Sequence, residues 1–586
     1  MRVHNTSIME SVKMRDIVSV DNLWFLHAGQ KEHALKNINM RISEGDFVLV
    51  AGPTGCGKST LALCLTGLIP NVLGGEMQGK VVVDEKDTRG HEVFQLAQSI
   101  GLVFQNTENQ LCSLSVEDEV AFGPENLALP RDEIEKRMDF ALNATSMYDL
   151  RHKYTFDLSG GQKHRTAIAA SLSMLPKILV LDEPLSELDP VGCRDVLQTL
   201  KKLNEEFHIT IILAEHKLEQ VLGFAKKVIL LNNGEIIANG ETSEVFKDKK
   251  LEEQLGLRIP ETLRFSYELI ERGLIAKPVL SVEEARASLP KIQASGLNRP
   301  SVPIHSQHLK ETRSSQKELI RAEGLCYSYY DGTVALQDID LSIFPGEFIA
   351  ILGGNGAGKT TLALQMSRQL KPTKGKMYIE GKDTAKLSIT DLVGIVGYTF
   401  QNPDCQLFCK TVSDEIAFGP KQLGLPKEEV SNRVKQTLEI MRLEQFKDRD
   451  PQTLSRGQKL GVAVASVLVM KPKVIILDEP TLGQDLNRIR SLMALLKSLN
   501  RQGITVVVIT HDINIAAEYA CRVILMDEGK VLADGDALDV LSEEDLLRSA
   551  SIEPPTAVYL SRLAGLPPML TVSEISAAVW GTNEVR

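Results

Sequence analysis

Gly52-Pro-Thr-Gly-Cys-Gly-Lys-Ser59 is the stretch of sequence that decides the fold of this chain. It follows an apolar run at residues 47–50 and precedes a helical pattern at residues 61–68. Glycines at this spacing let backbone N–H groups converge on phosphate oxygens, and the start of a helix favours an anion. The stretch therefore predicts a phosphate-binding loop between a buried strand and a helix.

The same pattern occurs a second time, as Gly353-Gly-Asn-Gly-Ala-Gly-Lys-Thr360. Two further segments recur at an offset of about 296 residues: Val103-Phe-Gln-Asn106 as Thr399-Phe-Gln-Asn402, and Val180-Leu-Asp-Glu-Pro184 as Ile476-Leu-Asp-Glu-Pro480. A repeat of this length indicates two domains of one type. In both halves, short β-branched runs alternate with helical patterns, which is typical of a sheet covered on both faces. We predict two tandem α/β P-loop NTPase domains.

The repeat also sets the expected domain boundaries. A segment rich in Ser, Gln and Pro between the halves lacks apolar periodicity and is predicted to be a linker. The predicted divisions are a tail at 1–15, a first ATPase domain at 16–290, a linker at 291–317 and a second ATPase domain at 318–586, with helical subdomains at 106–157 and 402–453 and a C-terminal extension in each domain.

Composition limits the class of protein. The chain has 586 residues, of which 43% are hydrophobic and 24% charged, as expected for a globular protein. No apolar run approaches the roughly 18 to 20 residues that cross a bilayer, and the N-terminal stretch lacks a secretory signal pattern. The eight scattered cysteines predict reduced thiols without a metal cluster. The net charge of −11 argues against nucleic acid as a partner.

The residues around each loop predict ATP and Mg²⁺ as cofactors. Lys58 and Lys359 are expected to reach the β- and γ-phosphates, and the hydroxyls of Ser59 and Thr360 to bind Mg²⁺. Acidic pairs follow a later apolar strand in each half: the first acid binds the metal and the second acts as general base toward water. These pairs are Asp182 with Glu183 and Asp478 with Glu479; the other predicted nucleotide-binding residues of the loops are Gly52, Gly55, Gly57, Thr60, Gly353, Gly356, Gly358 and Thr361.

The sequence Leu158-Ser-Gly-Gly-Gln162 extends these motifs to a specific family. Together with them, it resembles the signature of ATP-binding cassette (ABC) ATPases, over nearly the whole chain and twice. The resemblance implies a RecA-like α/β core with an antiparallel β edge and an inserted helical subdomain in each half. It also implies a head-to-tail pair in which each signature contacts the γ-phosphate held by the opposite cassette; the signature residues are Ser159, Gly160, Gly161 and Gln162 in the first half and Ser455, Arg456, Gly457 and Gln458 in the second.

The resemblance assigns further residues. Gln105 and Gln401 belong to the loop that senses Mg²⁺ and the membrane partner, and His216 and His511 to the switch that contacts the γ-phosphate. Tyr329 is the expected adenine-stacking ring of the second half. His27 aligns with it in the first half, and an ordinary core role remains the alternative for either ring.

The two halves differ at the signature. Arg456 replaces the first signature glycine, and Thr481-Leu-Gly-Gln-Asp485 stands where the first half has Leu185-Ser-Glu-Leu-Asp189. Because both general-base candidates are retained, we predict two competent sites of unequal rate.

The stretches that follow Gln105 and Gln401 indicate a subfamily of these ATPases. Asn106-Thr-Glu-Asn-Gln-Leu111 and Asn402-Pro-Asp-Cys-Gln-Leu-Phe408, each followed by Ala-Phe-Gly-Pro, resemble the ATPases of energy-coupling factor transporters, which import vitamins or cobalt and nickel ions in prokaryotes. That resemblance implies an integral membrane T component, a substrate-binding S component and a peripheral place on the cytoplasmic face of the membrane. Two alternatives remain: a soluble tandem cassette that acts on ribosomes or nucleic acid, and a nucleotide-gated scaffold without turnover.

Overall fold

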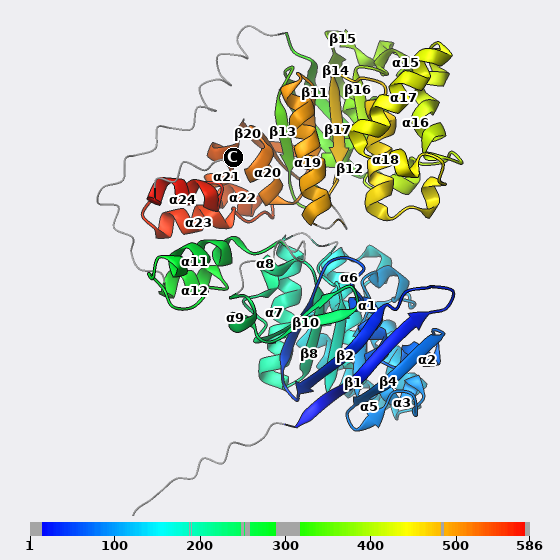
Figure 1. The fold of residues 1–586 in the computed structure, drawn as a ribbon, viewed down its shortest axis with the longest axis vertical. Helices are drawn as coiled ribbons and strands as arrows, with labels where there is room; N and C mark the ends of the chain where they lie inside the picture. The colour runs from blue at the N-terminus through cyan, green and yellow to red at the C-terminus, as the bar shows by residue number, and fades with distance from the viewer. Residues whose placement is uncertain are drawn as a thin grey trace, which may run out of the picture. The chain divides into compact units, whose positions relative to one another are not determined.

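The computed structural model describes residues 15–186, 188, 190–247, 251, 258–288, 317–481, 484 and 486–580. The chain divides into two compact units, a first that ends at Ile259 and a second from Pro260 onward (Figure 1). The predicted tail at 1–15 and linker at 291–317 lie almost entirely outside the described residues.

A six-stranded sheet forms the centre of the first unit. Five of its strands run parallel, and the sixth pairs antiparallel at one edge. Strands β3 (Phe47–Ala51), β7 (Ile178–Asp182) and β8 (Thr210–Glu215) are buried along their whole length, because the sheet is covered on both faces. In spatial order the strands are β10 (Glu235–Glu241), β9 (Lys227–Asn232), β3 (Phe47–Ala51), β8 (Thr210–Glu215), β7 (Ile178–Asp182) and β6 (Ile100–Val103).

An antiparallel sheet forms a second layer of the first unit. Phe25 of this sheet, Val48 of the parallel sheet and Leu61 of helix α1 (Lys58–Leu65) belong to one buried core. The helix that follows the phosphate-binding loop is thereby fixed to both sheets. In spatial order the antiparallel strands are β2 (Leu35–Ser43), β1 (Asp16–His27), β4 (Gly75–Val83) and β5 (Lys86–Asp87).

The helices that follow β6 form a separate layer, in which α4 packs on α5 and α6. Two of them, α4 and α5, fall within the predicted helical subdomain at 106–157. The described helices of this unit are α2 (Leu68–Asn71), α3 (Val93–Leu96), η1 (Thr107–Asn109), α4 (Val116–Asn126), α5 (Arg131–Ala144), η2 (Tyr148–Leu150), η3 (Thr155–Asp157), α6 (Gly160–Leu172), α7 (Pro190–Phe207), α8 (Leu218–Val221) and α9 (Thr242–Val245).

The second unit repeats both sheets. Ile351, Leu362 and Met377 link the parallel sheet, helix α14 (Lys359–Met366) and the antiparallel sheet in one core. The six-stranded sheet has the order β16 (Val396–Thr399), β17 (Val474–Asp478), β18 (Thr505–Ile509), β13 (Phe348–Leu352), β19 (Arg522–Asp527) and β20 (Lys530–Asp536). The antiparallel sheet has the order β12 (Val334–Ile343), β11 (Ile320–Ser328), β14 (Lys374–Ile379) and β15 (Lys382–Asp383).

Helices α16, α17 and α18 again gather beside the parallel sheet (yellow in Figure 1). The prediction of two α/β units, each with an antiparallel edge sheet and inserted helices, is confirmed. The described helices are η4 (Thr384–Lys386), α15 (Ile389–Leu392), η5 (Pro403–Cys405), α16 (Val412–Gln422), α17 (Lys427–Met441), η6 (Glu444–Phe446), η7 (Pro451–Thr453), α18 (Arg456–Leu468), α19 (Leu486–Arg501), α20 (Ile513–Tyr519), α21 (Ala537–Ser542) and α22 (Glu544–Ser549).

Four helices from the two C-terminal extensions pack together in the second unit (Figure 1). Glu261 accepts a hydrogen bond from Val572 N at 3.1 Å, and the Arg272 guanidinium lies 3.9 Å from the ring centre of Trp580. The sequence places the end of the first domain at residue 290, so that its extension belongs to the first half. In the structure, residues from Pro260 onward belong to the second compact unit, because the helices of both extensions share one core. The helices are α11 (Glu261–Glu271), α12 (Val282–Ser288), α23 (Thr556–Leu563) and α24 (Val572–Trp580).

We expect Leu269→Ala to destabilise this four-helix core. Leu269 is fully buried in it, so losing the side chain should lower the free energy of opening by about 2 to 5 kcal/mol. Hydrogen exchange of the amides in α11 and α23 measures that free energy. The control Leu274→Ala removes a side chain that is 48% exposed and should change it by less than about 0.5 kcal/mol. Equal effects of the two substitutions would contradict the packing described here.

Candidate nucleotide site

Each phosphate-binding loop runs from a buried strand to the first turn of a helix. Gly57 is the N-cap of α1 with φ 109°, and Gly358 is the N-cap of α14 with φ 93°. A Cβ atom at Gly57 would lie 2.7 Å from the carbonyl oxygen of Ala34, so both the conformation and the space require glycine. The loop therefore lies between a buried strand and a helix, as the sequence predicted, and its binding of phosphate stays a prediction.

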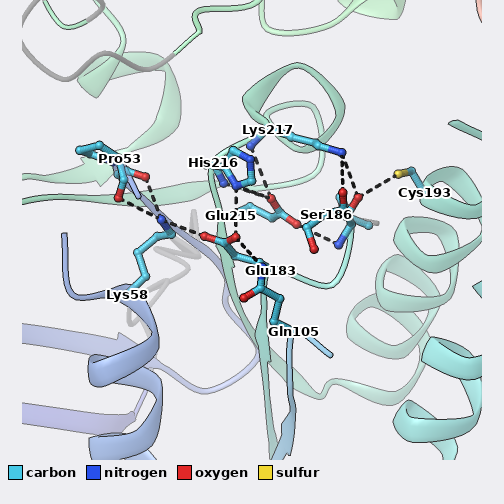
Figure 2. A network of polar contacts seen from close by, with 11 residues as sticks. Pro53, Lys58, Gln105, Glu183, Ser186, Cys193, Glu215, His216 and Lys217 are labelled. Atoms are coloured by element: carbon cyan, nitrogen blue, oxygen red, sulfur yellow. Dashed lines mark hydrogen bonds and ion pairs between the residues drawn. The ribbon is translucent and has the colours of Figure 1, made fainter. Parts of the chain in front are cut away.

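Lys58 lies at the centre of the first site (Figure 2). Its ammonium donates to the carbonyl oxygens of Gly52 at 2.9 Å and Pro53 at 3.2 Å, and lies 3.1 Å from Glu183 Oε1. The other carboxylate oxygen of Glu183 lies 3.4 Å from His216 Nδ1 and accepts a hydrogen bond from Gln105 Nε2 at 3.3 Å. Three residues predicted from separate motifs thus converge on the carboxylate of Glu183.

The charge of Glu183 is strongly stabilised by this arrangement. Burial alone would raise the pKa of its carboxyl, but the close contact with His216 and the positive charge of Lys58 outweigh burial and lower the pKa to about 2. Glu183 is therefore ionised at neutral pH and suited to orient a water molecule. Its backbone has φ 47°, a left-handed conformation that is uncommon for a non-glycine residue and directs the carboxylate into the site.

The second site repeats two kinds of contact, from the loop lysine to loop carbonyl oxygens and from the switch histidine to the glutamate. The ammonium of Lys359 donates to the carbonyl oxygens of Gly353 at 2.9 Å and Gly354 at 2.8 Å. His511 Nδ1 lies 3.0 Å from Glu479 Oε2, and Glu479 shares the left-handed backbone with φ 46°. Gln401 lies two residues beyond the end of β16, as Gln105 does beyond β6. Both candidate general bases therefore face their switch histidine.

The residues beside each loop fit a magnesium ion. Asp182 and Asp478 end strands β7 and β17, and each has an Oδ1 atom that is buried without a hydrogen-bond partner. Burial raises the pKa of both carboxyls, and hydrogen bonds involving Ser59 and Thr360 only partly offset the rise. A buried carboxylate oxygen beside a hydroxyl, without a donor of its own, matches the oxygen donors that Mg²⁺ takes.

In the second site, a tyrosine hydroxyl donates a hydrogen bond to the strand-end aspartate. Tyr398 donates a hydrogen bond from its hydroxyl to Asp478 Oδ2 at 2.9 Å. Burial and the neighbouring carboxylate raise the pKa of Tyr398, so its hydroxyl stays protonated. The first site has Leu102 at the corresponding position of the repeat.

The predicted stacking residues occupy matching places in the two halves. His27 Nε2 lies 3.2 Å from the hydroxyl of Thr60, and the Tyr329 hydroxyl lies 3.0 Å from that of Thr361. Each threonine is the second residue after the loop lysine, so the rings are fixed beside the first turn of α1 and α14. Tyr329 is 39% exposed, which leaves a face for a base. Their stacking role stays a prediction.

Each signature motif begins a helix. Ser159 Oγ caps α6 by accepting a hydrogen bond from Gln162 N, and Gln162 Oε1 accepts one from Ser159 N. Ser455 and Gln458 cap α18 in the same way, with Gly457 in the first turn beside the exposed Arg456. Gly160 and Gly161 open the first turn of α6. The pairing of each signature with the opposite cassette stays a prediction.

Some contacts were not foreseen from the sequence. Arg488 Nη1 donates to Ser455 Oγ at 3.2 Å, where the repeat has Gly192 in the first half. Glu215 and Lys217 flank His216 and bind the loop after Glu183 (Figure 2). An alignment of the two halves could have identified these residues. Arg488 aligns with Gly192, and Glu215 and Lys217 align with residues of different charge in the other half.

Two P-loops, each with a strand-end aspartate and a following glutamate, define the chain as a tandem P-loop NTPase. A family model described as "ABC transporter" matches residues 35–186 and 336–482. A protein of Methanosarcina mazei, described as "Putative ABC transporter ATP-binding protein", is 41% identical over 581 residues, covering 97% of this chain and 98% of its own length. A similarly described protein of Caldanaerobacter subterraneus subsp. tengcongensis is 41% identical over 549 residues, covering 94% of this chain and 96% of its own.

The chain belongs to the ABC transporter family and carries two ABC ATPase cassettes in tandem. This is a family of ATPases that bind and hydrolyse ATP. Among solved structures, cbiO1 from Clostridium perfringens, titled as part of the ABC transporter complex cbiONQ, is 40% identical, covers 40% of this chain and 94% of its own, and superposes with a TM-score of 0.37. Within the described residues, no helix combines the length and the apolar character needed to cross a bilayer.

Proposed function

We propose that the chain is the ATP-driven motor subunit of a prokaryotic importer of the energy-coupling factor type, powering uptake of a vitamin or a transition-metal ion. The observation that carries the proposal is the stretch after each site glutamine, which resembles that subfamily in both halves. In the first half it comprises Asn106-Thr-Glu-Asn-Gln-Leu111 and Val120-Ala-Phe-Gly-Pro-Glu-Asn126, and in the second Asn402-Pro-Asp-Cys-Gln-Leu-Phe408 and Ile416-Ala-Phe-Gly-Pro420.

Exposed apolar side chains on the helical layers support a docking role for these stretches. Leu114 and Phe122 are 70% and 51% exposed in the first unit. Phe408 and Phe418 form an edge-to-face pair in the second unit, with ring centres 4.8 Å apart, and both are exposed. Large apolar side chains grouped on a surface mark a site for a partner, and an amphipathic helix is the simplest one. We assign this partner as the coupling helices of a membrane T component.

In each unit, a buried glutamate accepts hydrogen bonds from the short segment before α4 or α16, which we call the docking segment (residues 112–114 and 408–410). Glu119 Oε2 accepts hydrogen bonds from Cys112 N at 2.9 Å and Ser113 N at 2.7 Å. Glu415 Oε2 accepts equivalent bonds from Phe408 N at 2.8 Å and Cys409 N at 2.7 Å. Because charge-assisted hydrogen bonds hold the segment to α4 or α16, movement at the site glutamine is transmitted to the docking surface.

The proposed cycle follows from the residues of the two sites. ATP would bind to the loop N–H groups and Lys58 or Lys359, and the opposite signature would close on the γ-phosphate. Mg²⁺, bound beside Asp182 or Asp478, supplies charge that neutralises the phosphates. Glu183 or Glu479 would orient water and accept its proton, and His216 or His511 would contact the γ-phosphate. Loss of that phosphate reopens the cassettes and moves the membrane partner.

In this proposal the protein binds peripherally to the cytoplasmic face of the membrane through the T component. A separate S component holds the transported substrate, so this chain does not select it. No nucleic acid partner is part of the proposal.

Co-expression with the membrane proteins encoded beside the gene tests the assignment. We expect the chain to copurify with them and to support ATP-dependent uptake, and Phe122→Ser to reduce copurification at least about fivefold because it removes an exposed apolar anchor. Phe94→Ser is the matched control, since Phe94 is also exposed in the first unit but lies on α3. Copurification with ribosomes instead of the membrane proteins would contradict the proposal.

A further inference from the structure

Glu215 is a fully buried carboxylate directly before the switch histidine of the first cassette. We propose that Glu215 and Lys217 form a positioning pair that ties His216 to the loop after Glu183, and that the second cassette, with Thr510 and Asp512 at these positions, does not carry this pair. The inference rests on the proposed role of Glu183 in hydrolysis.

The two oxygens of Glu215 bind two different segments. Oε1 accepts a hydrogen bond from Leu185 N at 2.9 Å, two residues after Glu183. Oε2 accepts from His216 N at 3.0 Å and from Lys217 N at 3.4 Å. Burying an ionised carboxylate is costly unless hydrogen bonds replace its water, and here three backbone donors do so. One side chain therefore fixes the switch segment and the catalytic loop to each other.

Lys217 binds the same loop after Glu183 through carbonyl oxygens (Figure 2). Its ammonium donates to the carbonyl oxygens of Leu185 and Ser186, each at 3.2 Å. The thiol of Cys193, on α7, also lies 3.6 Å from the carbonyl oxygen of Leu185. Leu185 is thus held at its N–H by Glu215 and at its carbonyl oxygen by Lys217, which leaves its peptide groups little freedom to rotate.

This restraint acts on the backbone of the catalytic glutamate. Glu183 N donates to Ala214 O at 2.9 Å, and Ser186 N donates to Glu183 O at 3.2 Å. The left-handed conformation of Glu183 persists only if its neighbours over-determine it, and the pair restrains Leu185 and Ser186, two and three residues further on. A displacement of His216 would therefore move Leu185 and Ser186 together with the carboxylate that contacts its ring.

The second cassette has a different pair of residues at these positions, Thr510 and Asp512. Thr510 Oγ1 accepts a hydrogen bond from Asp512 N at 3.0 Å, and Asp512 Oδ1 accepts one from Asn514 N at 3.0 Å as the N-cap of α20. A hydroxyl is too short to span two segments as a carboxylate does, and Asp512 carries no ammonium to donate to carbonyl groups. The link from switch to catalytic loop is therefore built differently in the two halves.

Single-site backgrounds test the inference. In a Glu479→Gln background, which reports the first site, Glu215→Gln should lower kcat for ATP about tenfold while KM changes less than twofold, because the carboxylate of Glu183 is misplaced but nucleotide contacts remain. In a Glu183→Gln background, which reports the second site, the same substitution should change kcat less than twofold. Equal losses in both backgrounds, or no loss in either, would overturn the proposal.

Lys217 provides an independent variant and a rescue. Lys217→Met should lower kcat of the first site to a similar extent, and Lys217→Arg should restore at least half of it because a guanidinium also donates to two carbonyl groups. Glu206→Gln, at an exposed position of α7, is the control for the change of charge. If turnover does not change with Glu183→Gln and Glu479→Gln, the catalytic role of the two glutamates is contradicted. If those variants lose turnover but the Glu215 and Lys217 variants do not, only the positioning pair is contradicted.

Discussion

ATP turnover should fall at least about 1000-fold when Glu183 and Glu479 are both replaced by glutamine. Each carboxylate faces its switch histidine, at 3.4 Å in the first site and 3.0 Å in the second, and glutamine keeps the shape but cannot accept a proton from water. General-base catalysis contributes about 100- to 10,000-fold, which sets the expected size of the loss. Steady-state phosphate release measures it, and ATP binding should persist because Lys58 and Lys359 are untouched.

The single variants should behave differently from the double variant. Glu183→Gln leaves the site built on Lys359, and Glu479→Gln leaves the site built on Lys58, so each should retain measurable turnover. We expect the retained rates to differ at least about threefold, because in the predicted head-to-tail pair Arg456 would stand in the signature that serves the Lys58 site, and a glycine in the signature that serves the Lys359 site. Arg456→Gly should narrow that difference.

Complete loss of turnover with either single substitution would show that the two sites do not act independently. Unchanged turnover in the double variant would remove both glutamates from the catalytic step. Glu206→Gln serves as control, since Glu206 is exposed on α7 and its substitution should leave turnover within twofold of the unsubstituted chain.

The sequence was sufficient to predict the features that depend on neighbouring residues. A glycine that must adopt a positive φ before a helix, as Gly57 does, produces a local pattern that can be read without the fold. Asp182 and Glu183 could be placed for the same reason, because a buried strand ends at Asp182. The family resemblance assigned His216 to the γ-phosphate switch but did not predict its contact with Glu183, because no periodicity relates residues that follow two different strands.

The sequence did not reveal contacts that depend on long-range packing. The hydrogen bond from Val572 N to Glu261 joins segments more than 300 residues apart, and each extension alone resembles an ordinary amphipathic helix pair. Glu215 was missed for a different reason. A charged residue after a buried strand is usually exposed, so its complete burial becomes visible only when Leu185, His216 and Lys217 are seen to surround it.

Gly57→Ala should abolish nucleotide binding at the first site. The added Cβ would lie 2.7 Å from Ala34 O and 2.9 Å from Leu35 Cδ2, and φ 109° is unfavourable for alanine. The loop must shift to relieve these contacts, which would move its backbone N–H groups away from the positions that converge on phosphate oxygens. Calorimetric titration with a non-hydrolysable ATP analogue should show the stoichiometry fall from two to one.

Gly358→Ala provides the mirror experiment, because its Cβ would lie 2.4 Å from Ala335 O, and the double variant should bind no analogue. Gly45→Ala separates this effect from the general cost of a left-handed alanine. Gly45 has φ 78° but no atom within 4 Å of its Cβ position, so the variant should lose about 1 kcal/mol of stability and still bind two nucleotides. If Gly57→Ala also binds two, the close approach of Ala34 to the loop does not control its geometry.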